Sequence, residues 1–153
     1  MIQLVRLIEV LNDLIRINND RITVYEKAAM ASRTISTDLK NVFHHLASES
    51  RKHVRALSTE VINLRGKPAT GSTTMGKLYQ VWSDLKAGIT GVDSRSLLAY
   101  CLGTEDSIQK IYGKILAADI QFPPAIHEKI LLQQQSLKNS HDLIIRYQHE
   151  LIH

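Results

Sequence analysis

The sequence predicts an all-α protein, a four-helix bundle in which a long crossover containing a short extra helix joins the second and third helices. Two observations predict this fold. Apolar residues recur at alternating steps of three and four over four long segments, without the strict alternation that is typical of strands. These segments are joined by two short links and one long link, and link length restricts how the helices of a bundle can be connected.

The first two helices are predicted to form an antiparallel hairpin. One stripe runs over residues 4–32 and the next over residues 39–64, with only a few residues between them. Ser36 or Thr37 is expected to cap the second helix, because a hydroxyl there can accept a hydrogen bond from a free N–H group of the first turn. Gly66 is expected to take the left-handed conformation that ends this helix.

The last two helices are predicted to form a second hairpin. Asp93 or Ser94 can cap the third helix, whose stripe runs over residues 98–115. The "DIQFPP" motif then breaks the chain, and the fourth helix is expected to begin at Pro124, because proline is favoured in the first turn of a helix. The stripe of this helix extends over residues 126–151.

The link between the two hairpins spans roughly residues 66–93 and contains "MGKLYQVWSDLKAGI", a pattern that indicates a short helix. A link of this length can travel back along the bundle, so that the second and third helices become parallel. This arrangement is the ferritin-like variant of the four-helix bundle. The alternative is that the middle helix packs on the bundle only as an extra lid.

Composition and charge indicate a globular protein of one domain, residues 1–153. The net charge is +4 and the basic residues are scattered, which argues against a nucleic-acid partner. No stretch approaches the ~20 apolar residues of a membrane span. Arg6, Glu9 and Asp13 interrupt the amino-terminal segment, where a signal peptide would be continuously apolar. With one cysteine and no internal disulfide, the chain is expected to be cytoplasmic.

Four stretches carry a resemblance to a known family: "LNDLIRINNDRITVYEKAA" at residues 11–29, "VWSDLKAGITG" at 81–91, "GTEDSIQKIYGKIL" at 103–116 and "SHDLIIRYQ" at 140–148. They resemble an uncharacterised bacterial family of four-helix-bundle proteins that is grouped with the ferritin-like superfamily. The resemblance covers nearly the whole chain and implies the ferritin-like topology. It implies little about activity, because the family is a domain of unknown function and a fold does not determine a function.

The stretch "HELIH" at residues 149–153 matches the H-E-x-x-H pattern of zinc proteases. Such an enzyme needs a third protein ligand, an open coordination position and a substrate cleft. His153 is expected to lie where the helix frays, and His149 and Glu150 fall off the packing stripe. We interpret the motif as an exposed helix end and not as a protease site.

Polar residues interrupt the apolar stripe near the middle of every long helix. They are Asn18 and Tyr25, Glu49 and His53, Glu105 and Tyr112, and Gln134 and His141. A ferritin-like di-metal site uses a Glu from each of two helices and a Glu-x-x-His motif from each of the other two. The candidate metal ligands are Glu26, Glu49, His53, Glu105 and His141, because carboxylates can bridge two cations and imidazoles can complete their coordination.

The match to a di-metal site is partial. Glu49 and His53 are four residues apart instead of three, the fourth helix lacks a glutamate before His141, and Glu26 lies at the flank of its stripe. Three interpretations therefore stay open. The layer is a buried hydrogen-bonded network that fixes helix register, a weak or single metal site, or a di-iron oxidase site, with iron as the expected metal in the last case.

Two classes of function follow from these interpretations. The first is a non-catalytic bundle with a degenerate metal site, acting through association with itself or with a protein partner, in stress physiology as in related ferritin-like families. The second is a metal-dependent redox or iron-handling protein that uses Glu49, His53, Glu105 and His141. Tyr79 and Trp82 on the short middle helix are expected either to cap the bundle or to contribute to a homodimer.

Overall fold

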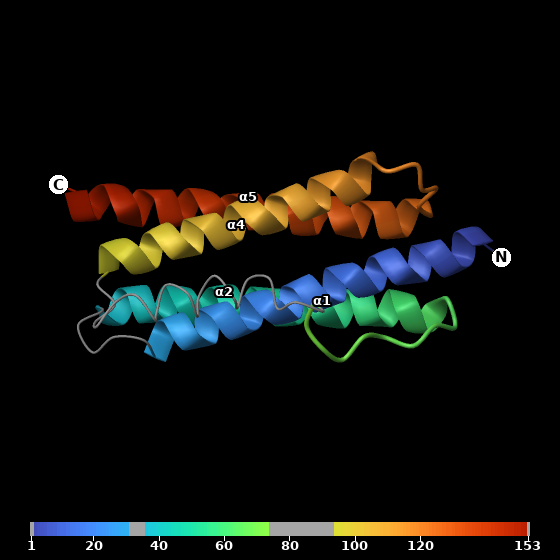
Figure 1. Ribbon diagram of the computed structural model, residues 1–153, viewed down its shortest axis with the longest axis horizontal. Helices are drawn as coiled ribbons and strands as arrows, with labels where there is room; N and C mark the ends of the chain where they lie inside the picture. The colour runs from blue at the N-terminus through green and yellow to red at the C-terminus, as the bar shows by residue number, and fades with distance from the viewer. Residues whose placement is uncertain (1, 31–35, 74–93, 153) are drawn as a thin grey trace.

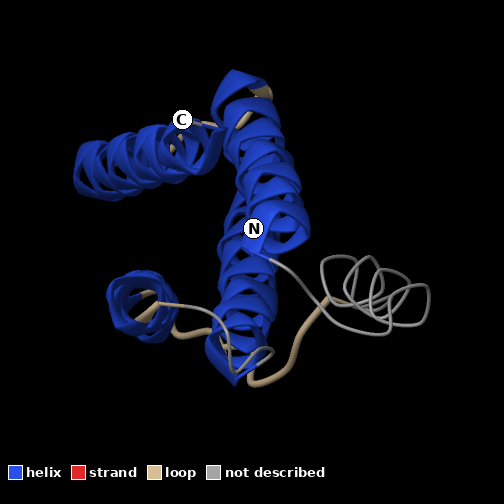
Figure 2. Ribbon diagram, turned by 90° about the vertical axis from the view of Figure 1, so that its left-hand side faces the viewer, coloured by secondary structure: helices blue, strands red, loops and turns tan. Residues whose placement is uncertain are grey.

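The structure is a computed structural model that describes residues 2–30, 36–73 and 94–152. In these ranges it contains four long helices and no strand (Figure 2). They are α1 (Ile2–Met30), α2 (Thr37–Asn63), α4 (Ser94–Ala117) and α5 (Pro124–Ile152). The predicted all-α four-helix bundle is confirmed. The short helix expected at residues 75–89, with its aromatic pair, lies outside the described residues.

The directions of the helices confirm the long crossover. Helices α1 and α5 run one way along the bundle, whereas α2 and α4 run the other way and are therefore parallel (Figure 1). Helix α1 packs against α2 and α4, and α5 packs against the same two helices, so that every packed pair is antiparallel. The connectivity is that of a bundle with one long crossover between parallel helices, while its assignment to the ferritin-like superfamily stays a prediction.

The starts of α2 and α5 lie where the sequence predicts them. The N–H of Leu39 donates to Oγ of Ser36 at 3.2 Å, so Ser36 and not Thr37 is the N-cap of α2. Helix α5 begins at Pro124, as expected.

None of the described helices is long and apolar enough to cross a membrane.

The end of α2 differs from the prediction by one residue. Arg65, and not Gly66, has the left-handed conformation, with φ of 65°. The N–H of Gly66 donates to the carbonyl of Val61 and that of Arg65 to the carbonyl of Ile62, both at 2.9 Å, which is the bond pair of a Schellman motif. Gly66 serves a different purpose, because a Cβ there would lie 2.9 Å from Cγ2 of Ile8 on α1.

The first part of the crossover is fastened to α1 by polar side chains. Oδ1 of Asn12 accepts from the N–H of Ala69 at 2.8 Å, and Nδ2 of Asn19 donates to the carbonyl of Gly71 at 2.8 Å. Two turns of α1 separate these contacts. The chain that leaves α2 therefore runs back along α1, which is what a crossover between parallel helices requires.

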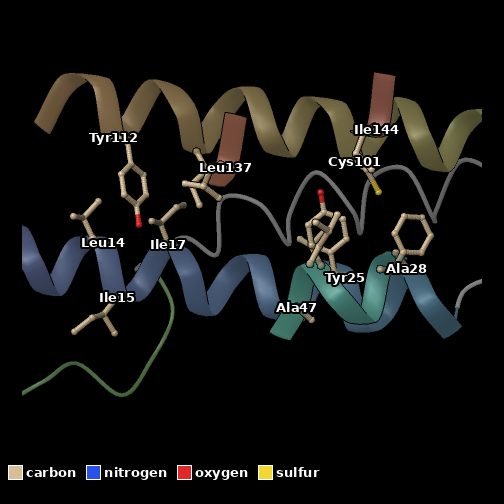
Figure 3. Packing of buried hydrophobic residues seen from close by; sticks show 14 of the residues in the cluster. Leu14, Ile15, Ile17, Tyr25, Ala28, Ala47, Cys101, Tyr112, Leu137 and Ile144 are labelled. Carbon is tan, nitrogen blue, oxygen red and sulfur yellow. The ribbon is translucent and has the colours of Figure 1, made fainter. Parts of the chain in front are cut away.

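The core between the hairpins is mainly aliphatic. Figure 3 shows Tyr112 of α4 reaching towards α1 between Leu14 and Ile17, all of them buried. The ring of Tyr25 on α1 stacks on Phe43 of α2, with 5.8 Å between the ring centroids. Between these two tyrosines the apolar core gives way to a layer of polar side chains.

Candidate functional site in a buried polar layer

A buried arginine joins three helices in this layer. Arg21 on α1 has no exposed surface. Its Nε and Nη2 atoms donate to the two carboxylate oxygens of Glu105 on α4 at 2.9 and 2.6 Å, and its Nη1 atom donates to Oε1 of Glu49 on α2 at 2.8 Å. Bidentate pairing of a guanidinium with a carboxylate is among the stronger side-chain interactions. Arg21 therefore neutralises Glu105, which is also fully buried.

Two serines of α5 complete the surroundings of Glu49. Oγ of Ser136 donates to Oε2 at 2.6 Å, and Oγ of Ser140 donates to Oε1 at 3.0 Å. Burial by itself raises the pKa of Glu49, but Arg21 and Ser136 outweigh it and hold the pKa below its usual value. Together, the two carboxylates and the guanidinium carry an excess of negative charge. This excess lies on Glu49, the carboxylate that accepts hydrogen bonds from two serine hydroxyls in addition to Arg21. All four helices meet at this point.

A chain of amides and hydroxyls extends the layer beyond the charges. The hydroxyl of Ser50 accepts from Arg21 and donates to Oδ1 of Asn18, both at 2.9 Å. Nδ2 of Asn18 donates to the hydroxyl of Tyr112 at 2.9 Å, and Tyr112 donates to Oε1 of Gln133 at 2.8 Å. Charged and neutral parts therefore form one network, in which a change at one member leaves another without its partner.

His53 is held in one neutral form by this network. Nδ2 of Asn18 donates to the carbonyl of Leu14, so the atom 3.2 Å from Nδ1 of His53 is the oxygen of Asn18. That oxygen can only accept, and Nδ1 must therefore carry the proton, which leaves a lone pair on Nε2. Burial lowers the pKa of His53 to about 4, against an opposing effect of Glu49.

The structure brings together some of the predicted metal ligands but places a cation of the protein between them. Glu49 and Glu105 both lie in the layer and are bridged by Arg21, and His53 joins the same network. Within the described ranges, no group of three or more His, Cys, Asp or Glu residues is arranged to hold a metal ion. The binding of a metal at these residues stays a prediction.

The other two candidates lie outside the hydrogen-bonded layer. His141 is partly exposed, and its Nε2 atom lies 2.8 Å from Oδ1 of Asp106 on α4. Glu26 is half-exposed and forms an ion pair with Arg51 of α2. In the "HELIH" stretch, His149 and Glu150 are exposed, as the sequence predicts.

At three positions on α1 and α5, the buried residue is the neighbour of the one that the periodicity predicts. The structure buries Arg21, Gln133 and Ser140, where the predicted stripes have Ile22, Gln134 and His141. Successive residues of a helix differ by about 100° in direction, so an apolar stripe alone cannot decide between neighbours at its edge. The two inward-facing glutamates, Glu49 and Glu105, are the feature of the sequence that points to a buried cation such as Arg21. Two buried carboxylates require either a nearby cation or protonation.

A comparison with known protein families gives a match over most of the chain. A family model described as a domain of unknown function, DUF2383, matches residues 6–118. The chain belongs to the DUF2383 family. The match includes α1 from residue 6 onwards, α2 and α4, and with them every member of the layer except those on α5. No curated protein matched this DUF2383 chain. The expectation of an uncharacterised family is confirmed, and the function has to be inferred from the site.

Proposed function

We propose that this DUF2383 protein is a non-catalytic helical bundle that acts through association with itself or with a protein partner. The observation that supports this proposal is the position of Arg21 between Glu49 and Glu105. Carboxylates that bridge two metal ions must turn their oxygens towards the metals. Here both oxygens of Glu105 accept from Arg21, and both oxygens of Glu49 accept from Arg21 or from serines. Glu49 and Glu105 thus contribute to the packing of the helices.

The surface offers apolar side chains for association at one end of the α1–α2 hairpin. Val5 on α1 is 56% exposed and Ile62 on α2 is 60% exposed. Both lie near the contact of Gly66 with Ile8 that closes this end of the hairpin. Exposed apolar side chains that gather in one region are typical of protein interaction sites. We infer that this end contributes to a homodimer or to a partner interface.

Sedimentation equilibrium tests the association directly. The wild type is expected to show a concentration-dependent mass between monomer and dimer, and the double variant Val5→Ser, Ile62→Ser is expected to shift towards monomer. Leu131→Ser, at an exposed leucine of α5, is the matched control and is expected to behave like the wild type. A wild type that stays monomeric at high concentration would contradict the homodimer. The protein, including any role in stress physiology, would then have to act through a different protein partner.

The alternative is a metal-dependent redox or iron-handling protein that uses Glu49, His53, Glu105 and His141. The ferritin-like connectivity and the two carboxylates in one layer favour it. The residues do not fit a pair of metal ions as they are arranged, because a metal between the carboxylates would displace Arg21 and leave a buried guanidinium without partners. Aerobic addition of ferrous iron separates the two functions, since an oxidase produces a ferric-oxo absorption band.

A further inference from the structure

A groove lies between α2 and α5, next to the polar layer. Its volume is about 280 Å³, and its lining consists of Lys52, His53, Ala56, Lys129, Leu132 and Gln133. The ion pair of Lys129 with Glu60 on one side, and the contacts of Ser136 with Glu49 on the other, hold the two helices together around it. The groove is thus bounded by fixed contacts at both ends.

One wall of the groove carries a free hydrogen-bond acceptor. His53 lines the groove, and its Nδ1 atom is used by Asn18. Nε2 of His53 has a lone pair and no hydrogen-bond partner in the part of the chain that the structure describes. A ligand with an O–H or N–H group can therefore bind here without breaking the network behind the histidine.

The remainder of the groove combines apolar walls with positive charge. Ala56 and Leu132 supply apolar surface on opposite helices. Lys129 is paired with Glu60, whereas Lys52 forms no ion pair among the described residues. A ligand that complements this lining has an apolar body, an anionic group for Lys52 and a hydrogen-bond donor for His53.

We propose that the groove binds a small carboxylate with an apolar body and a hydrogen-bond donor, of which a hydroxybenzoate is a simple example. The volume lies at the lower limit of small-molecule sites and suits one ring rather than a large cofactor. The hydroxyl donates to Nε2 of His53, the ring packs between Ala56 and Leu132, and the carboxylate pairs with Lys52. This site is additional to the proposed association and uses none of the residues tested there.

Titration of the full chain with 4-hydroxybenzoate, followed by NMR, tests the site. Saturable shifts are expected at groove residues of α2 and α5. His53→Asn keeps an amide that can donate to Asn18 but removes the Nε2 acceptor, and it is expected to weaken binding about tenfold. Lys52→Ala is expected to weaken binding about threefold, because the rim charge is exposed. Lys138→Ala, an exposed lysine of α5 outside the groove, is expected to bind like the wild type.

Four results of this titration and of its controls would overturn the proposal. Equal affinity for benzoate, phenol and 4-hydroxybenzoate would show only a non-specific apolar groove. Unchanged affinity in both His53→Asn and Lys52→Ala would exclude the proposed contacts. Shifts that follow the protein concentration and not the probe would assign the groove to a second copy of the chain. Binding of an acidic peptide, with none of 4-hydroxybenzoate, would assign it to a protein partner.

Discussion

Arg21 on α1 and Glu105 on α4 form a bidentate ion pair in which neither side chain has exposed surface. Because α1 and α4 belong to different hairpins, this pair connects the two halves of the bundle. A buried ion pair gives little net stability compared with apolar residues of the same shape, but the loss of one partner leaves a charge without compensation. We therefore expect the pair to specify how the two hairpins face each other.

Replacing Glu105 with glutamine is expected to destabilise the fold. The variant keeps the shape of the side chain but replaces the bidentate charged pair with a neutral amide. Arg21 keeps its ion pair with Glu49, so the expected loss in the free energy of unfolding is that of the charge-assisted hydrogen bonds, about 1.5–3 kcal/mol. Urea denaturation measures it. The neighbouring Asp106→Asn is the matched control at an exposed site and is expected to cost less than about 1 kcal/mol. Equal losses in both variants would contradict the role of the buried pair.

The neutral state of His53 predicts that acid weakens the fold. Burial lowers the pKa of His53 from 6.5 to about 4, so between these values the unfolded chain binds a proton that the folded chain does not. The free energy of unfolding therefore falls as the pH falls from about 6.5 to about 4, by about 1–3 kcal/mol. The contribution of Glu49, whose folded pKa is lowered from 4.5, is present above that value and is lost at still lower pH.

Urea denaturation across this pH range, on the wild type and on His53→Asn, checks the pH dependence. The asparagine variant cannot titrate at this position but retains a donor for Asn18. Its free energy of unfolding is expected to vary less between pH values of about 6.5 and 4 than that of the wild type. The same slope in both proteins would assign the acid sensitivity to other groups.

The left-handed residue at the end of α2 predicts a stabilising substitution. Arg65 has φ of 65° and an exposed side chain, so Arg65→Gly is expected to raise the free energy of unfolding by about 0.5–1 kcal/mol through relief of backbone strain. Gly66→Ala is expected to have the opposite effect, a loss of about 1–3 kcal/mol, because its Cβ would press on Ile8. Thermal denaturation of both variants measures the difference. A destabilised Arg65→Gly would show that the arginine side chain contributes more than its conformation costs.

The bundle could be predicted from the sequence because its signals are local or depend only on link length. Apolar periodicity marks the helices, Ser36 and Pro124 mark two of their starts, and the long link predicts that α2 and α4 are parallel. The contacts that fasten the crossover could not be predicted. Asn12 and Asn19 form hydrogen bonds with the backbone of a loop that is distant in the sequence. A polar residue on the outer face of a helix is usually exposed to solvent, so its type alone does not predict such a contact.

The composition of the polar layer could be predicted only in part. Glu49, His53 and Glu105 were recognised because they interrupt apolar stripes. Arg21 was missed, because an arginine beside an isoleucine is normally assigned to the surface and the isoleucine continues the stripe. Two inward glutamates can be balanced by a metal, by protons or by a buried cation of the protein, and only the geometry distinguishes these solutions.

We infer that Arg21, and not a metal ion, balances the charge of Glu49 and Glu105. Elemental analysis of untagged, purified protein, combined with thermal denaturation with and without a chelator, tests it most directly. We expect no stoichiometric transition metal and the same melting temperature in both conditions. A stoichiometric metal that is lost in Glu49→Ala and in Glu105→Ala, together with a lower melting temperature of the wild type in chelator, would contradict it.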